Sequence, residues 1–257
     1  MKAKKHLGQN FLKSGKALRD IILAAKISGE DIVVEIGPGK GALTEKVLES
    51  AGKVIAIEKD EELIPVLEEK FKEEIKSKKL ILLKDDILTF DLSKLPKKYK
   101  IVANIPFYIT GAILEKFLES KYQPSVMALI VQKEVAERVV ARDGKESILS
   151  MSVRVFGEPK FVSKIPARYF SPEPKVDSAI LLIENIKNTL KESQKDEFFR
   201  LVKGGFSQKR KTLIKNLSGL GIKRELLEEK FKELSLDQNI RAEKLSLSDW
   251  LLLLKSI

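Results

Sequence analysis

The sequence contains no cysteine and only one histidine, His6. The missing thiols exclude disulfides and cysteine nucleophiles, and a single imidazole excludes Cys/His zinc sites and Ser-His hydrolytic schemes. Any chemistry must therefore rest on asparagine, acids, lysine, the backbone or a bound cofactor, and we expect no metal. The absence of cysteine is also compatible with a cytoplasmic location, which we expect.

Long apolar runs are absent as well. The basic N-terminus, from Met1 to Lys5, is not followed by an apolar stretch of signal-peptide length. The longest apolar run near the C-terminus, from Trp250 to Leu254, is far too short to cross a bilayer. We therefore expect no association with membranes.

Hydrophobic residues make up 43% of the 257 residues, which is enough for a sizeable core. The chain carries a formal net charge of +11, and 33% of its residues are charged. Such a balance favours a polyanionic partner. The alternative is a solvated surface rich in Lys and Glu, of the kind common in thermophiles.

Six apolar runs rich in β-branched residues alternate with amphipathic stretches such as Ala42–Glu49 and Glu61–Ile75. Continuous apolar strands that alternate with helices predict a parallel sheet with helices on both faces. The predicted strands are Ile32–Ile36, Val54–Ile57, Leu80–Leu83, Ile101–Ala103, Val126–Val131 and Ala179–Ile183.

The alternation stops after Glu184, where helical patterns follow one another with Gly204-Gly205 and Gly219–Gly221 between them. We therefore predict an α/β domain over residues 1–184 and a small all-helical domain over 185–257. The predicted helices of the second domain are Lys195–Leu201, Gln208–Leu217, Arg224–Leu234 and Ser248–Lys255.

A glycine loop follows the first predicted strand, with the spacing G-x-G-x-G from Gly37 to Gly41. Glu58 ends the next strand, where an acid can bind both ribose hydroxyls of a nucleoside cofactor. The loop fits either NAD or S-adenosylmethionine. The glycine spacing is wrong for a pyrophosphate, and Glu35 suits a cationic amino acid group, so S-adenosylmethionine is favoured. Asp86, or Asp85 beside it, could accept from the adenine amine.

The segment Asn104-Ile105-Pro106-Phe107 ends the fourth predicted strand. Two oxygens aimed at an exocyclic amine can localise its lone pair, and an aromatic face can hold the base flat. Asn104 can supply one oxygen and the Ile105 carbonyl the other, since Pro106 restricts the residue before it. Phe107 supplies the face. Taken alone, the same segment could be a strand end followed by a turn.

The chain resembles the bacterial small-subunit (16S) ribosomal RNA adenine N6-dimethyltransferases almost from end to end. One such motif is weak evidence, whereas eight in order are strong. The resemblance rests on residues 7–12, 35–44, 57–60, 86–88, 104–107, 131–138, 170–178 and 206–213. It implies a Rossmann-like class I methyltransferase with a mostly parallel seven-stranded sheet. The implied reaction is methylation of two adjacent adenosines in the 3′-terminal hairpin loop, and the family usually has Tyr where this chain has Phe107.

The resemblance implies S-adenosylmethionine as methyl donor, S-adenosylhomocysteine as product and the precursor of the 30S subunit as partner, with a role in subunit biogenesis. We expect the protein to act as a monomer. The residues that it implies around the cofactor are Gln9, Asn10, Leu12, Gly37, Glu58, Lys59, Asp86, Ile87 and Asn104.

Phe170 resembles a second aromatic wall for the flipped adenine, or else is a loop anchor. RNA contacts are expected from basic residues, although each basic run could instead be a solvated helix face. The basic residues are Lys4, Lys5, Arg138, Arg142, Lys209, Arg210 and Lys211.

Three other functions stay open on the sequence. The nearest is methylation of a large-subunit rRNA adenine, which confers macrolide resistance. The Gly37-Pro38-Gly39 spacing and the 175–178 segment argue against this function. The second is a non-catalytic RNA-binding assembly or transcription factor on the same fold. The third is an NAD-dependent oxidoreductase, which the glycine spacing disfavours.

Overall fold

The structure is a computed structural model that describes Lys4 and residues 7–257. Its contacts divide the chain into two compact units. The first comprises residues 1–136 and 157–187, and the second comprises residues 137–156 and 188–257. No helix in the described part of the chain has both the length and the apolar character that a membrane span requires.

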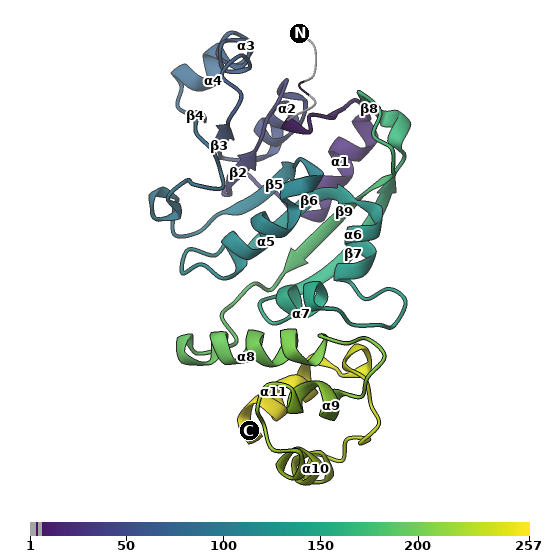
Figure 1. Cartoon of the computed structure of the whole chain (residues 1–257). Helices are drawn as coiled ribbons and strands as arrows, with labels where there is room; N and C mark the ends of the chain where they lie inside the picture. The colour runs from purple at the N-terminus through teal and green to yellow at the C-terminus, as the bar shows by residue number, and fades with distance from the viewer. Residues whose placement is uncertain (1–3, 5–6) are drawn as a thin grey trace. The chain divides into compact units, whose positions relative to one another are not determined.

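The first unit is built on a seven-stranded sheet (Figure 1). Its neighbouring strands run in the order β4 (Leu80–Lys84), β3 (Lys53–Glu58), β2 (Ile32–Ile36), β5 (Lys100–Asn104), β6 (Val126–Gln132), β9 (Ser178–Glu184) and β7 (Glu158–Ile165). The first five strands are parallel, and β9 is antiparallel to both of its neighbours. This confirms the mostly parallel sheet. The chain order reverses between β2 and β5, which is where open α/β sheets bind their ligands.

Helices cover both faces of the sheet. Val33 and Val54 point to one face, where they join a core that includes α1 (Gly15–Ala24) and α2 (Ala42–Ser50). Val34 and Ile55, which alternate with them, are 0% and 7% exposed and point to the opposite face. The buried side of α5 (Thr110–Leu118) lies outside the first core. Two buried faces explain why the strands read as unbroken apolar runs.

Two features of this unit differ from the prediction. Strand β7 was not predicted, because it is an edge strand whose side chains alternate between exposed and half-buried. The single helix predicted over Glu61–Ile75 is two helices, α3 (Ile64–Lys70) and α4 (Lys72–Lys76). Phe71 breaks it with φ −116° and ψ 31°, and its ring packs against Gly41.

A second, two-stranded sheet joins the N-terminal segment to the rest of the first unit. Strand β1 (Phe11–Leu12) pairs antiparallel with β8 (Phe170–Ser171), so that Leu12 lies opposite Phe170. The loop predicted at Phe170 therefore begins as a short strand. Short 3₁₀ turns complete the described chain: η2 (Leu92–Lys94), η3 (Phe107–Ile109), η4 (Ala167–Tyr169) and η5 (Ala242–Lys244).

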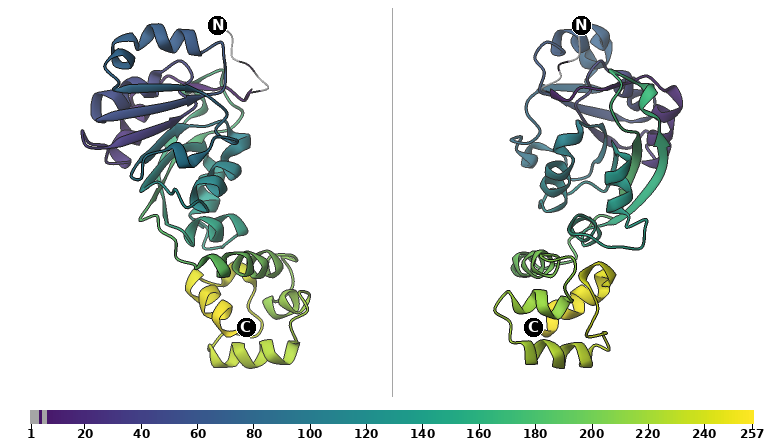
Figure 2. Two further views of the ribbon diagram at one scale, coloured as in Figure 1. Left: turned by 90° about the vertical axis from the view of Figure 1, so that its left-hand side faces the viewer. Right: turned by 45° about the vertical axis from the view of Figure 1, so that its right-hand side comes forward.

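The second unit is helical (Figure 2). Its helices are α7 (Ile148–Arg154), α8 (Glu192–Gly205), α9 (Leu213–Ser218), α10 (Arg224–Glu233) and α11 (Leu247–Ser256), and α6 (Lys133–Val139) leads into it. Helix α8 continues through Gly204 and Gly205, which were predicted to separate helices. A Cβ at Gly205 would lie 2.4 Å from the Trp250 ring, so the glycine permits close packing of α8 against α11. Helix α9 begins five residues after its predicted start at Gln208.

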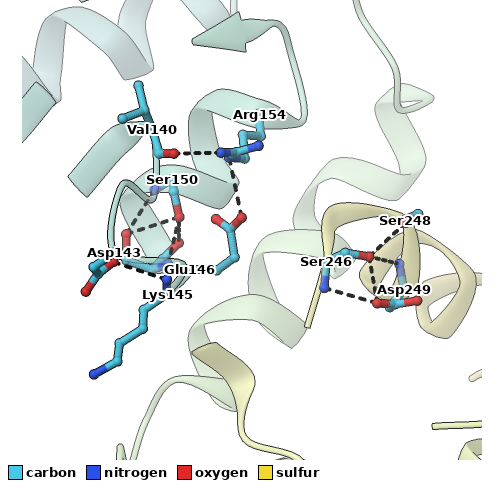
Figure 3. Close-up of polar contacts among 10 residues, drawn as sticks. Val140, Asp143, Lys145, Glu146, Ser150, Arg154, Ser246, Ser248 and Asp249 are labelled. Carbon is cyan, nitrogen blue, oxygen red and sulfur yellow. Dashed lines mark hydrogen bonds and ion pairs between the residues drawn. The ribbon is translucent and has the colours of Figure 1, made fainter. Parts of the chain in front are cut away.

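The predicted domain boundary at Glu184 needs a correction, because residues 137–156 group with the helical unit. The Glu146 amide donates to the Glu243 carbonyl at 2.9 Å, and the Phe156 and Phe199 rings lie 6.3 Å apart. Within the segment, Arg154 donates to the Val140 carbonyl at 2.8 Å, and Ser246 and Asp249 cap α11 nearby (Figure 3). The Glu146–Glu243 and Phe156–Phe199 contacts join segments that are far apart in the sequence, which apolar periodicity alone does not reveal.

Candidate active site

A cavity of about 120 Å³ opens at the carboxyl ends of β2, β3 and β5. The N-terminal segment, the glycine loop, the end of β3 and the segment after β5 form most of its wall. The corresponding residues are 7–12, 35–40, 42–43, 57–59 and 104–109, together with Leu18, Leu63 and Ile87. The structure thus brings together most of the residues that the sequence proposed for the cofactor.

The glycine loop forms one wall. Gly37 and Gly39 have φ values of +66° and +60°, a conformation that L side chains rarely adopt. A Cβ at Gly37 would meet nothing within 4 Å, so the backbone there faces open space. A Cβ at Gly39 would lie 3.0 Å from the Phe11 ring, so the N-terminal segment packs directly on the loop. The loop therefore leaves room for a ligand on one side and is supported on the other.

Glu58, which is 6% exposed, ties the end of β3 to the glycine loop. Its Oε2 accepts from the Gly39 amide at 3.0 Å and its Oε1 accepts from the Asp60 amide at 2.8 Å. Burial raises the pKa of Glu58, although these two amides oppose the effect. A carboxylate has about four acceptor positions, so each oxygen retains one for a ribose hydroxyl.

Glu35 lies at the cavity wall with only 1% of its surface exposed. Its Oε2 has no hydrogen-bond partner among the described residues. Burial raises the pKa of Glu35 from 4.5 to about 8; the Thr44 hydroxyl opposes this, and the neighbouring charge of Glu58 adds to it. A buried acid with an unused oxygen beside a cavity is suited to a cationic group. This observation fits the amino acid portion of S-adenosylmethionine.

Asp86 is bonded to neighbouring residues of the chain. Its Oδ2 accepts from Lys59 at 2.8 Å and its Oδ1 from the Leu88 amide at 2.9 Å, and it does not line the cavity. Burial would raise the pKa of Asp86, but the bonds from Lys59 and Leu88 outweigh it and lower the pKa. Ile87 and Lys59 do line the cavity, and Asp85 accepts from the Asp86 amide.

Asn104, the last residue of β5, points its side chain at the N-terminal segment. Its Nδ2 donates to the Asn10 carbonyl at 2.9 Å. Because a carbonyl can only accept, this bond sets which way the amide faces. Among the described residues, neither Asn104 Oδ1 nor the Ile105 carbonyl accepts a hydrogen bond from a side chain or from a turn or loop amide. Both oxygens are therefore available at the cavity that Asn104 and Ile105 line.

Phe107 is half-buried in η3 and lines the same cavity. The Thr110 hydroxyl donates to the Phe107 carbonyl at 3.0 Å and holds this turn at the start of α5. The neighbouring Tyr108 is 66% exposed and also lines the cavity. Its ring packs on Gly8, where a Cβ would lie 3.0 Å away.

The N-terminal segment is held by Asp60, which was not among the predicted site residues. Asp60 is 4% exposed, and its carboxylate accepts from Gln9 Nε2 at 2.7 Å and from Lys4 Nζ at 2.7 Å. Burial would raise the pKa of Asp60, but these bonds outweigh it and lower the pKa. Gln9, Asn10 and Leu12 all line the cavity, as the sequence proposed.

Two of the proposed RNA contacts in the first unit have other partners here. Lys4 pairs with Asp60 and, at 2.9 Å, with Glu62. Phe170 is 2% exposed, packs in the core with Leu12 and does not line the cavity, which favours the loop-anchor interpretation over an aromatic wall. Lys5 lies outside the described residues.

The remaining basic residues lie in the second unit. Arg138 and Arg142 are exposed, and Arg142 pairs with Glu137 at 3.1 Å. Residues Lys209–Lys211 are exposed in the loop between α8 and α9, and no carboxylate of the described chain pairs with them. Asn216, which is 5% exposed, holds this loop by donating to the Gln208 carbonyl at 3.1 Å.

No three His, Cys, Asp or Glu side chains of the described residues come together as a possible metal-ligand set. The cavity instead offers a glycine loop, a buried acid at the end of each of two neighbouring strands, and two acceptors beside an aromatic ring. This sheet and this arrangement of groups define a class I methyltransferase.

Comparisons with known proteins specify the family. The model of the family described as ribosomal RNA adenine dimethylase matches residues 1–257. The chain therefore belongs to the ribosomal RNA adenine dimethylase family. It is 44% identical to a ribosomal RNA small subunit methyltransferase A of Dehalococcoides mccartyi strain CBDB1, over 97% of this chain and 87% of that protein. It is 38% identical to the Fusobacterium nucleatum protein of the same name, over 99% and 97%.

Solved structures agree with this family. A dimethyladenosine transferase from Plasmodium falciparum has a TM-score of 0.80 and 30% identity, covering 95% of each chain. The 23S rRNA methyltransferase ErmE has a TM-score of 0.79 and 26% identity, covering 96% of this chain and 99% of that one. The fold is thus shared with one enzyme whose name refers to 23S rRNA and with another whose name refers to dimethyladenosine.

Proposed function

We propose that this protein transfers methyl groups from S-adenosylmethionine to N6 of two adjacent adenosines in the 3′-terminal hairpin loop of small-subunit rRNA. The orientation of Asn104 carries the proposal: its Nδ2 is held by the Asn10 carbonyl, which leaves Oδ1 as an acceptor in a cavity that Ile105 and Phe107 also line. The names of the bacterial relatives, which specify the small subunit, support this substrate over large-subunit RNA.

Each group of cavity residues has its own role in binding the cofactor. When bound, S-adenosylmethionine supplies an electrophilic methyl group and leaves as S-adenosylhomocysteine. Glu35 neutralises the cationic amino acid portion, Glu58 accepts from the ribose hydroxyls, and the open backbone at Gly37 allows close approach. Gln9, Asn10 and Leu12 close the cavity from the N-terminal side. Their positions follow from the contacts described above.

The amine is bound by the segment after β5. An adenine taken out of its stack can lie against Phe107 while its two N6 hydrogens meet Asn104 Oδ1 and the Ile105 carbonyl. By accepting from these hydrogens, the two oxygens localise the lone pair on N6. Most of the acceleration then comes from positioning and from fixed dipoles. Once it carries the methyl group, N6 is cationic and acidic, and it releases one proton to solvent. One hydrogen then remains on N6, so one of the two acceptors is still used.

RNA phosphates are assigned to the exposed loop Lys209–Lys211, with Arg138 and Arg142 as further contacts in the same unit. The absence of acidic partners around that loop among the described residues supports the assignment. We further propose that the protein acts as a monomer in the cytoplasm on a precursor of the 30S subunit, and without a metal.

The test is Asn104→Ala in a methyl-transfer assay with labelled cofactor and under-methylated small subunits. We expect the variant to retain cofactor affinity and to lose roughly a hundredfold or more in turnover, as removal of a preorganised polar contact does elsewhere. Asn188→Ala, in the exposed loop before α8, is the matched control and should keep full activity. Normal turnover of Asn104→Ala would refute the assigned role.

A further inference from the structure

The described N-terminal segment lines one wall of the cavity and is held on both sides of Asn10. On its C-terminal side, strand β1 pairs with β8, and the Lys13 amide donates to the Tyr169 carbonyl at 2.8 Å. On its N-terminal side, the Gln9 amide group donates to the Asp60 carboxylate at 2.7 Å. Asn10 lies between these two anchors, so the position of its carbonyl depends on both.

Asp60 is well suited to be the N-terminal anchor. It is 4% exposed, and both of its oxygens are used, Oδ2 by Gln9 and Oδ1 by Lys4. Its own amide donates to Glu58 at 2.8 Å, so the anchor is joined to the acid that supports the glycine loop. A buried carboxylate that accepts two charge-assisted or amide hydrogen bonds holds its partners in place more strongly than an exposed one does.

The Asn10 carbonyl in turn fixes the side chain of Asn104, 94 residues away, at 2.9 Å. Without this acceptor, the Asn104 amide could turn over and present Nδ2 to the cavity. A donor facing the amine hydrogens of adenine would repel them instead of accepting from them. The bond to Asn10 also polarises the amide and makes Oδ1 a better acceptor.

We propose that Asp60 is a positioning residue for methyl transfer: through Gln9 it holds the Asn10 carbonyl, which keeps the Asn104 oxygen directed at the target amine. This inference rests on the proposed function, because it assigns Asp60 a role in presenting that same acceptor. Asp60 itself does not line the cavity, so it acts only through the segment that it holds.

The test compares Asp60→Ala with Glu62→Gln. Glu62 also pairs with Lys4, but it is 61% exposed and makes no contact with Gln9, so it is a matched control. At saturating cofactor and RNA, we expect kcat of Asp60→Ala to fall roughly tenfold, the factor expected when the neutral hydrogen bond between Asn104 and the Asn10 carbonyl no longer orients the acceptor. Glu62→Gln should stay within about twofold of the parent protein, since exposed ion pairs contribute little.

A double-mutant cycle separates positioning from general damage. In the Asn104→Ala background there is no amide to orient, so Asp60→Ala should lower the residual rate no further. The same loss in both backgrounds, or an unchanged kcat in Asp60→Ala alone, would overturn the inference. If Asp60→Ala does not fold, Asp60→Asn replaces it in the cycle, because it keeps the volume and the Asp60 amide but removes one acceptor.

The two proposals can fail separately. If the parent protein methylates small subunits but the effects of Asp60→Ala and Asn104→Ala are additive, the positioning role is overturned and the proposed function remains intact. A parent protein that transfers no methyl group to small-subunit RNA overturns both proposals.

Discussion

Glu35 leads to a quantitative prediction about cofactor binding. Burial raises its pKa from 4.5 to about 8, which corresponds to an ionisation penalty of about 5 kcal/mol for the protein without ligand, taken as an upper bound. At pH 7, on the order of one Glu35 side chain in ten is then ionised. A bound ammonium group stabilises the ionised form of Glu35. The protein molecules in which Glu35 is still protonated must therefore release that proton when the ligand binds.

The assay is calorimetric titration of S-adenosylhomocysteine in buffers that differ in ionisation enthalpy. We expect release of about 0.9 proton per ligand at pH 7 and about 0.1 at pH 9, because Glu35 is already ionised at the higher pH. Glu35→Gln keeps the size of the side chain but cannot titrate, so it serves as the control and corrects for protons of the ligand. If the parent protein and Glu35→Gln release the same number of protons at pH 7, Glu35 does not lose a proton on ligand binding and the assigned role is refuted.

Three further outcomes are expected, for Glu35, for Gly39 and for the basic loop Lys209–Lys211. Because the pKa of Glu35 is raised, its contribution to stability is complete below pH 4.5 and is lost as the pH rises through about 8. The free energy of unfolding, measured with denaturant, should therefore fall with pH by at most about 1.4 kcal/mol per pH unit, and Glu35→Gln should remove this dependence. Gly39→Ala should destabilise the protein by about 1–3 kcal/mol in thermal or denaturant unfolding, because φ is +60° and the Phe11 ring is 3.0 Å away, whereas Gly111→Ala on α5 should not. Replacing all three basic residues of Lys209–Lys211 by Ala should lower the slope of log affinity against log salt by about 2 in RNA-binding titrations, and an unchanged slope would exclude phosphate contacts there.

The sheet could be predicted because its strands are covered on both faces. Val54–Ile57 and Ala179–Ile183 are continuous apolar runs, and each lies within a strand of the structure. Strand β7 has one exposed side, with Lys160 and Lys164 among its apolar residues, so no such run identifies it. Apolar periodicity detects burial, and therefore misses the edge of the sheet.

The candidate site was predictable only in part. Glycine spacing, Glu58 and the Asn104 segment are visible as motifs, and the structure places them around one cavity. The Asn10 carbonyl could not be predicted as a partner of Asn104, because every residue has a carbonyl and this contact spans 94 residues. Asp60 was missed for a similar reason, since a strand-end acid gives no indication of the side chains that it will bind.

The helical unit shows how far packing can depart from local signals. Gly204 and Gly205 suggest a break, yet α8 includes both, because the neighbouring Leu220 and Trp250 occupy the space that side chains would need. Residues 137–156 likewise join this unit through contacts such as that between Glu146 and Glu243. Propensity describes a residue alone, whereas these outcomes depend on its neighbours in space.

The proposed function is tested most directly by methyl transfer from labelled S-adenosylmethionine to under-methylated small subunits and, in parallel, to large-subunit RNA. We expect dimethyladenosine in the small-subunit RNA alone, at two adjacent positions. Label in the large-subunit RNA would contradict the assigned substrate, and absence of label from both RNAs would contradict catalysis and favour a role as a binding factor.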